Sequence, residues 1–406
     1  MVLSAFPATA QLTATEKRGR AIYLSGAPTG TAVVAGADLP ATSLACGSCH
    51  GPDGRGVPEG TIVPKDIRKL RPRYDDAALR KAITHGVDPA GIELSTVMPR
   101  YRLAAADLTD LIAYLNRLND PSPGVTPAEL TITTTIPHEL TRTIVAAFVK
   151  DLNTSGGIYG RTLALTSDVD KAFAIVCAAA TTIDPHERIP ILTPFPTTAP
   201  PATSYFLYPD IETQALSLAR SIEPGAHNVA IVHTDAQAAA EALKAYGESQ
   251  QWTFDGTKPP DLLFLLGRVD PAHLDSKARI FIAGATLTPE LLASKRNITV
   301  AVPTLPGDVH PEAQEELDAF AARHQLARSP VLTATFATMK VFVEALKRTG
   351  RDLTREKFIA AMEQLYEFPT GYTPPVTFNR NRHIGTAGAY VVSLESGKRV
   401  YVPARP

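Results

Sequence analysis

The feature that most constrains this chain is a short stretch, Cys46-Gly47-Ser48-Cys49-His50. Two cysteines three positions apart, followed directly by a histidine, form the attachment pattern of a c-type haem. Cys46 and Cys49 would bond the vinyl groups of the haem, and His50 would be an axial ligand of the iron. A redox dithiol, a disulfide and half of a zinc site share the cysteine spacing. A zinc site needs a second pair of ligands, and the chain has no second cysteine pair. The motif therefore predicts one covalent haem c.

The iron of an electron-carrying haem usually has a sixth ligand, and a thioether raises its reduction potential. Met98 follows the motif at a suitable distance in the sequence, and Pro99 would hold the backbone beside it extended. We therefore expect His50 and Met98 to be the two axial ligands. Two alternatives stay open: Met98 is a core methionine that fills a gap, or His85 is the sixth ligand.

Two helices are predicted on either side of this motif. Thr13 and Glu16 form the pattern of a capping box, which opens a helix through Gly19 and Tyr23. A second helix, from Asp107 to Leu118, has leucine and isoleucine on one face. Ala104, just before it, has no side-chain acceptor for the first amides, so we expect a weakly capped start.

Residues 11–118 resemble a class I cytochrome c on these features. In that family the first and last helices cross, and a glycine lets an aromatic side chain and a leucine pack closely. Gly19, Tyr23, Leu111 and Tyr114 match this pattern. The resemblance implies an all-α domain with one haem.

Length and charge limit what the rest of the chain can be. The 406 residues predict two or three domains, and 44% apolar residues suffice for packed cores. The net charge of −1 gives no reason to expect a nucleic-acid partner. No apolar run reaches the roughly 18 residues that span a bilayer, so no transmembrane segment is expected. Cys177, the third cysteine, lies in an apolar run and is expected to be a small buried residue.

The first ten residues predict the location of the protein. Haem attachment to this motif takes place outside the cytoplasm, so an export signal is required. Residues 1–10 are too short for an apolar signal core, but Ala8-Thr9-Ala10 resembles a signal-peptidase site. We interpret residues 1–10 as a residual signal peptide cleaved before Gln11, with a disordered tail as the alternative. The predicted location is periplasmic.

Two further stretches are a basic segment, residues 65–81, and a predicted linker, residues 119–127. Arginines and lysines between residues 65 and 81 outnumber the nearby aspartates. They are either a solvated face or a docking surface for an acidic redox partner. Residues 119–127 contain three prolines and a glycine without periodicity, which predicts a short, stiff linker.

From residue 128 onward, short apolar strands alternate with helical segments, which predicts parallel sheets covered by helices. The predicted strands are 162–165, 172–177, 189–192, 205–207, 229–232, 262–266, 280–283, 298–302, 390–394 and 399–402. The predicted helices are 139–152, 211–222, 310–325, 333–349 and 354–366. A single sheet of this many strands would be large, so two smaller doubly wound α/β lobes fit better.

Residues 128–406 resemble a type I periplasmic solute-binding protein of the branched-chain amino acid group. The matching stretches are residues 152–161, 345–353 and 371–378, and the first ends a helix in a Gly-Gly turn before a strand. The resemblance implies three crossings between lobes, near Tyr208-Pro209, Pro303-Thr304 and Phe368-Pro369. Lobe I would comprise residues 128–207 and 305–369, and lobe II residues 208–304 and 370–406.

The resemblance also implies a solute cleft between the lobes. The candidate contacts are Ala179, Thr181, Thr182, Thr193, Tyr208 and Thr286. They are equally well interpreted as ordinary loop and cap residues. Where the family often has an acidic residue for the amine of the solute, Gly284-Ala285-Thr286-Leu287 has none, although Asp210 or Asp308 could approach from other loops. A solute without an amine is therefore favoured.

These features predict an extracytoplasmic monohaem electron-transfer protein whose binding-protein region docks a partner or senses a ligand. The expected redox partner is a periplasmic dehydrogenase or another cytochrome. The alternative is a substrate-binding protein that delivers a small carboxylate or amino-acid-like solute to an ABC permease, with the haem as an accessory. Peroxidase or oxidase activity is not expected, because a bound Met98 would occupy the position that peroxide or oxygen needs.

Overall fold

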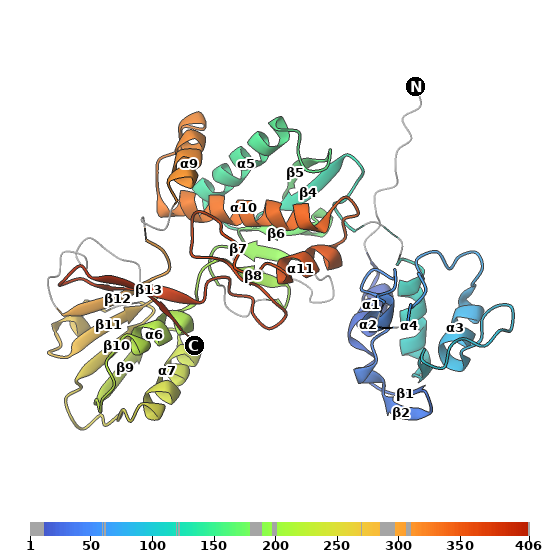
Figure 1. The fold of residues 1–406 in the computed structure, drawn as a ribbon, viewed down its shortest axis with the longest axis horizontal. Helices are drawn as coiled ribbons and strands as arrows, with labels where there is room; N and C mark the ends of the chain where they lie inside the picture. The colour runs from blue at the N-terminus through green and yellow to red at the C-terminus, as the bar shows by residue number, and fades with distance from the viewer. Residues whose placement is uncertain are drawn as a thin grey trace.

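The computed structural model describes residues 12–58, 60, 62–118, 120, 122–178, 189–196, 201–268, 270–284, 297–305 and 310–404. Figure 1 shows three bodies along the chain: a mostly helical N-terminal domain, a central α/β lobe and a second α/β lobe. Within the described ranges, no helix combines the length and apolar character needed to cross a membrane.

The N-terminal domain contains helices and a small three-stranded sheet, so the all-α prediction is not confirmed for this domain. Its helices are α1 (Ala14–Ser25), the short 3-10 turn η1 (Ala41–Ser43), α2 (Cys46–His50), α3 (Asp76–His85) and α4 (Ala105–Leu115). Its strands, in the order β2-β1-β3, are β1 (Thr31–Val34), β2 (Ala37–Pro40) and β3 (Arg100–Arg102). Ala35 and Gly36 both have positive φ and form a tight turn that joins β1 to β2. Alanine seldom adopts this conformation, so no turn pattern in the sequence indicates the hairpin.

The predicted crossing of the first and last helices is confirmed. A Cβ atom on Gly19 would lie 1.9 Å from the carbonyl oxygen of Asp110, so α1 approaches the backbone of α4 directly. The buried rings of Tyr23 and Tyr114 pack beside this contact with centroids 5.5 Å apart. The capping box of Thr13 and Glu16 is present at the start of α1, whereas α4 has no side-chain cap, as expected from Ala104.

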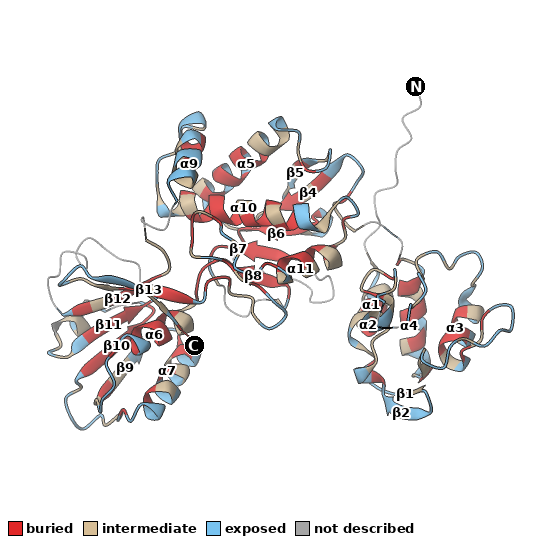
Figure 2. Ribbon diagram, viewed as in Figure 1, coloured by how far each residue is buried: buried red, intermediate tan, exposed pale blue. Residues whose placement is uncertain are grey.

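Lobe I is built on a five-stranded parallel sheet with the order β5-β4-β6-β7-β8. Its strands are β4 (Glu129–Thr133), β5 (Thr162–Thr166), β6 (Ala174–Val176), β7 (Ile191–Thr193) and β8 (Ser204–Phe206). Its helices are α5 (Glu139–Thr154), η2 (Val169–Lys171), α9 (Pro311–Arg323), α10 (Pro330–Thr349) and α11 (Arg355–Glu363). The core strands are buried on both faces, which is why their sequences are nearly continuous apolar runs (Figure 2).

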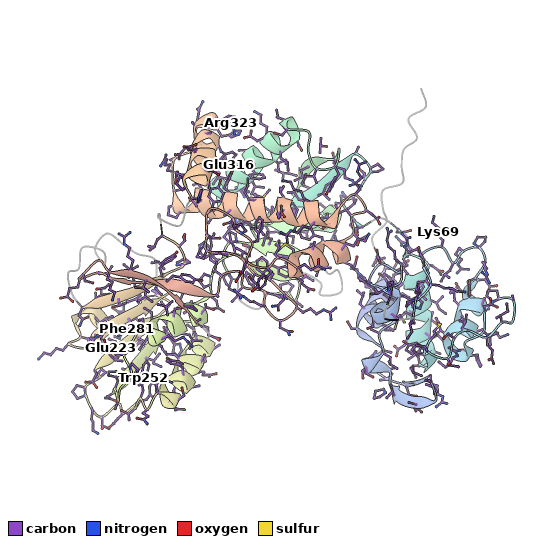
Figure 3. All side chains as sticks on the ribbon, viewed as in Figure 1. Lys69, Glu223, Trp252, Phe281, Glu316 and Arg323 are labelled. Atoms are coloured by element: carbon purple, nitrogen blue, oxygen red, sulfur yellow. The ribbon has the colours of Figure 1, made fainter. Side chains whose placement is uncertain are left out.

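Lobe II contains a six-stranded sheet with the order β14-β13-β12-β11-β10-β9. Strands β9 to β12 are parallel to one another. Strand β13 pairs antiparallel with β12 on one side and with β14 on the other. The strands are β9 (Val229–His233), β10 (Leu262–Leu266), β11 (Arg279–Ala283), β12 (Ile298–Val302), β13 (Gly388–Ser393) and β14 (Arg399–Pro403). The helices are α6 (Ile211–Arg220), α7 (Gln237–Ser249) and the 3-10 turn η4 (Pro271–Asp275). Figure 3 labels Trp252 and Phe281, both buried in the core of this lobe.

The chain crosses between the lobes three times, and the third crossing differs from the prediction. Between β8 and α6, and between β12 and α9, it changes lobe where predicted. It does not leave lobe I at Phe368-Pro369, because Tyr372, Val376 and Phe378 are buried in the lobe I core. The amide of Gly385 still donates to the carbonyl of Phe206 in β8 (2.8 Å). The third crossing therefore lies between Gly385 and β13, and residues 370–385 belong to lobe I.

The end of the predicted linker packs onto lobe I. The Thr131 amide donates to the carbonyl of Gly124 (2.7 Å), and Val125 belongs to the core of the lobe. Gly124 has φ +75, and a Cβ atom there would lie 2.5 Å from the amide nitrogen of Phe173. This segment is therefore held by the lobe and is not a free spacer.

Candidate haem site and solute cleft

The Cys-x-x-Cys-His motif forms a helix of its own, α2, and a tyrosine hydroxyl holds the chain at each end. The Tyr101 hydroxyl donates to the carbonyl of Leu44 (2.8 Å), just before α2. The Tyr23 hydroxyl donates to the carbonyl of Gly51 (2.7 Å), directly after His50. Gly51 has φ +75, a conformation that favours glycine and ends the helix there. Tyr23 comes from α1 and Tyr101 from β3, so the domain core fixes both ends of the motif.

His50 is oriented as an axial ligand requires. Its Nδ1 lies 3.0 Å from the carbonyl oxygen of Lys65. A carbonyl only accepts, so Nδ1 carries the proton and Nε2 has a lone pair available for a metal. Burial lowers the pKa of His50, and the bond to the Lys65 carbonyl partly opposes this effect. The neutral imidazole, which is the form that binds iron, is therefore favoured.

The two cysteines are free thiols on the same short helix. Cys49 is exposed and Cys46 is half-buried, with its sulfur 4.0 Å from the Tyr101 hydroxyl. Burial raises the pKa of Cys46 to about 11, despite the contact with Tyr101. Both sulfurs are therefore available for thioether bonds and are not used in a disulfide.

The Met98 loop is held by one arginine. The Arg100 guanidinium donates to the carbonyls of Leu94 (2.6 Å), Ser95 (3.3 Å) and Met98 (2.5 Å). Gly86, at φ +67, leaves room for this guanidinium, since a Cβ atom there would lie 1.6 Å from Arg100 Nε. Met98 lies three residues before Tyr101, whose hydroxyl lies 4.0 Å from the Cys46 sulfur, so Tyr101 connects the end of this loop to the motif. The side chain of Met98 is half-buried.

The competing ligand, His85, is the last residue of α3. Its Nδ1 lies 2.7 Å from the hydroxyl of the neighbouring Thr84. No cluster of three or more histidine, cysteine, aspartate or glutamate side chains forms a separate metal site in the described part of the chain. Cys46 and Cys49 fit the covalent attachment of a c-type haem and His50 fits its axial ligation, and bound haem would supply a one-electron couple.

The basic stretch after the motif is partly neutralised on the surface. Arg68 pairs with Asp66, Arg71 with Asp76, and Arg73 with Asp88. Lys65, Lys69 and Lys81 are exposed, and Figure 3 labels Lys69 on this domain. An exposed ion pair such as Arg71–Asp76 contributes little to stability, and the exposed lysines are accessible to an acidic partner.

Two of the predicted solute contacts are described, and both are buried. Thr193 is 2% exposed, and its hydroxyl donates to the carbonyl of Ala178 (3.2 Å). Tyr208 is fully buried, and its ring stacks on Phe195 with centroids 5.0 Å apart. Asp210 caps α6, accepting from the Thr213 amide (2.7 Å). Ala179, Thr181, Thr182, Thr286 and Asp308 lie outside the described residues.

Comparison with known proteins assigns both parts of the chain. The family model for cytochrome c matches residues 33–119, and the model for periplasmic binding protein matches residues 251–399. The chain joins a cytochrome c domain to a periplasmic binding protein domain. No curated protein matches the chain.

Solved structures show the fold of the binding domain. A fatty acid ABC transporter substrate-binding protein from Thermomonospora curvata has a TM-score of 0.51 at 15% identity, covering 70% of this chain and 94% of that one. A branched-chain amino acid ABC transporter protein from Thermus thermophilus with bound valine has a TM-score of 0.50 at 14% identity, covering 68% and 96%. At these identities the likeness concerns the fold alone.

The cytochrome domain uses three residues that the sequence analysis did not identify: Tyr101, Lys65 and Arg100. Tyr101 and Arg100 lie just after Met98-Pro99, so their nearness to the candidate ligand was the only available signal. Lys65 acts through its backbone carbonyl, which any residue supplies, and no sequence pattern marks it.

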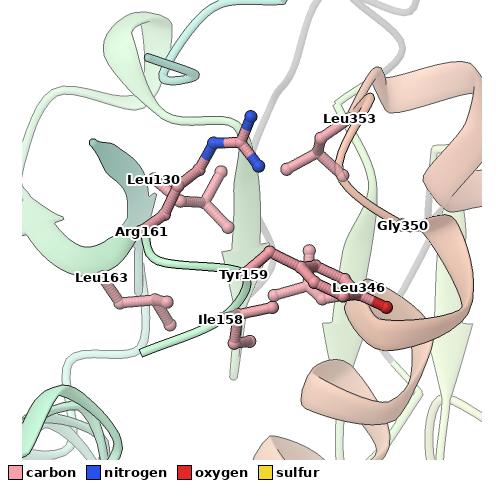
Figure 4. A pocket seen from close by; sticks show the side chains of 8 residues that line it. All are labelled: Leu130, Ile158, Tyr159, Arg161, Leu163, Leu346, Gly350 and Leu353. Atoms are coloured by element: carbon pink, nitrogen blue, oxygen red, sulfur yellow. The ribbon is translucent and has the colours of Figure 1, made fainter. Parts of the chain in front are cut away.

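The binding domain also has a small hollow at the outer edge of lobe I (Figure 4). Together with the open solvent at its mouth, it amounts to about 230 Å³, and it is lined mainly by leucine and isoleucine. The guanidinium of Arg161 at its rim donates to the carbonyls of Thr126 and Arg351. Ligand pockets usually enclose about 300–1,000 Å³, so this hollow is a packing feature of the lobe edge.

Proposed function

We propose that this protein is an extracytoplasmic electron-transfer protein with one covalent haem c. Cys46 and Cys49 would hold the haem, and His50 and Met98 would be its axial ligands. The binding domain would dock a redox partner or sense a solute. The supporting observation is the bond between His50 Nδ1 and the Lys65 carbonyl, which directs Nε2 of a neutral imidazole toward a metal.

The chain's residues favour electron transfer over catalysis. Arg100 fixes three carbonyls around Met98, so the thioether sits on a loop that is held in place. A sixth ligand held in this way excludes peroxide and oxygen from the iron and leaves little structural change between oxidation states. Peroxidase or oxidase activity is therefore not proposed.

A second candidate function is solute delivery to an ABC permease, with the haem as an accessory. The two-lobed fold, which solved ABC-transporter substrate-binding proteins share, favours it. The genes beside this one discriminate between the functions: a permease and an ATPase favour delivery, and a periplasmic dehydrogenase favours electron transfer.

Covalent haem attachment is tested by replacing Cys46 and Cys49 with alanine. We expect haem staining of the denatured protein to be lost, because no thioether bond remains. Cys177→Ala is the matched control, since Cys177 is buried in lobe I and should leave staining unchanged. Staining that survives the double replacement would contradict the assignment.

Ligation by Met98 is tested by Met98→Leu, which removes the sulfur and keeps most of the volume. We expect loss of the thioether–iron charge-transfer band at the red end of the visible spectrum and a lower reduction potential. Met362→Leu, a buried methionine of α11 in lobe I, is the control. If the unaltered protein lacks this band, and its potential is unchanged in Met98→Leu but shifts in His85→Ala, His85 is the ligand instead.

A further inference from the structure

The cytochrome domain contacts lobe I through the first turn of α11. Arg20 of α1 and Glu356 of α11 form an ion pair between side chains that are 7% and 9% exposed. A buried ion pair tolerates little displacement, because separating the partners leaves two charges without compensation. The hollow beside it, about 630 Å³ of partly open space, is lined by residues of both domains, including Arg20, Asp53 and Glu356.

A second set of contacts reaches the turn that follows His50. Lys357 Nζ lies 3.6 Å from Asp53 Oδ2 and 2.8 Å from Asp352 Oδ2. Arg55 pairs with both Asp53 and Asp352. The turn is tied to the ligand, because the Gly56 amide donates to the His50 carbonyl (2.7 Å). Charges of the binding domain therefore lie against the loop that carries the axial histidine.

Helix α11 is itself fixed within lobe I. Arg355, 1% exposed, donates to the carbonyls of Ala172 (2.6 Å) and Phe173 (3.1 Å), just before β6. Its amide donates to the hydroxyl of Ser122 in the linker (3.1 Å). The ring of Phe358 packs edge-on against Phe173. These contacts fix the position of the first turn of α11 and therefore of its charged side chains.

We propose that the first turn of α11 is an electrostatic partner of the haem loop, so that the binding domain sets the reduction potential of the haem in the same chain. This inference rests on the haem attachment proposed above. The contact brings together three cations and three anions: Arg20, Arg55, Lys357, Asp53, Asp352 and Glu356. The three positive and three negative charges leave the loop near neutrality. A change in any one of these charges would change the electrostatic potential at the haem.

The sign of the effect follows from charge. An oxidised haem carries one more positive charge than a reduced haem. Removing the cation of Lys357 therefore favours the oxidised state and lowers the potential, whereas removing the anion of Asp352 raises it. A movement of α11 that weakens these contacts changes the reduction potential of the haem. By linkage, the oxidation state of the haem changes the free energy of the contact between the two domains by the same amount.

The test is spectroelectrochemical titration of the full chain with Lys357→Gln and Asp352→Asn. Both side chains are at least partly exposed, so the fold should persist. At a fixed applied potential, we expect the ratio of oxidised to reduced haem to rise about twofold or more in Lys357→Gln and to fall in Asp352→Asn. Lys357→Arg should keep the original ratio.

Lys340→Gln is the matched control, because it removes a lysine from the ion pair with Glu316 between α10 and α9. It should leave the potential unchanged. Equal potentials in all variants, with haem attached, would overturn this inference and leave the proposed function standing. Absence of covalent haem from the unaltered protein would overturn the proposed function and this inference with it.

Discussion

At the scale of single residues, Gly19 decides how the cytochrome domain is assembled. Alanine there would place its Cβ 1.9 Å from the Asp110 carbonyl and 2.9 Å from Tyr114 Cβ, so α1 and α4 would have to separate. We expect Gly19→Ala to lower the free energy of unfolding by about 1–3 kcal/mol, measured by thermal or denaturant unfolding. Gly256→Ala, where a Cβ atom meets nothing within 4 Å, is the control. Equal stability of the two variants would contradict the close crossing.

The candidate haem residues follow from the sequence alone, and their attachment to haem stays a prediction. Cys46, Cys49 and His50 carry a pattern whose chemistry is local, so neighbours in the chain suffice to identify it. Their support was not predictable, because Tyr23 and Tyr101 bind carbonyl oxygens whose positions depend on the fold. The solute contacts were placed only by resemblance. Of these, Thr193 and Tyr208 are buried in lobe I.

At the scale of elements, α11 depends on Arg355. Arg355→Met would leave the carbonyls of Ala172 and Phe173 without this donor, while relieving the cost of a buried cation. We expect a net loss of about 2–3 kcal/mol in the stability of lobe I, followed by denaturant unfolding. Arg351→Met, an exposed arginine in the loop just before α11, should change stability by less than about 0.5 kcal/mol. If Arg355→Met leaves the stability of lobe I unchanged, α11 is held by its apolar face alone.

Elements with continuous apolar runs were predicted well, and elements without them were missed. Residues 262–266 and 298–302 form strands with the predicted bounds, because both faces of each strand are covered. Helix α7 was missed because its buried residues are Ala239, Leu243 and Gly247, so its inner face carries only one large apolar side chain. The third crossing was misplaced because Phe368-Pro369 contains a proline, as the other two predicted crossings do. The buried Tyr372 and Phe378, which keep the chain in lobe I, lie further on.

At the scale of the whole molecule, the described contacts connect the cytochrome domain to lobe I, and the polypeptide connects lobe I to lobe II. The cytochrome domain rests on α11, α11 is fixed to the strands of lobe I, and lobe I continues into lobe II through β8 and residues 383–385. The Phe206 amide donates to the His383 carbonyl (2.8 Å), so the two segments that lead into lobe II are bound to each other within lobe I. A solute that closed the lobes would therefore act on lobe I, which also carries the haem domain.

Charge determines which solutes the predicted cleft would accept. A free amino acid would bring an ammonium group into the predicted cleft, and leaving that group buried and unpaired would cost several kcal/mol. Residues 284–287 supply no carboxylate, and Asp210 already caps α6. We therefore expect leucine, isoleucine and valine to bind more weakly than micromolar in calorimetry with the full chain. A carboxylate without an amine, titrated in parallel, avoids this cost and should bind more tightly. Micromolar affinity for any of the three amino acids would show that another acidic group reaches the cleft.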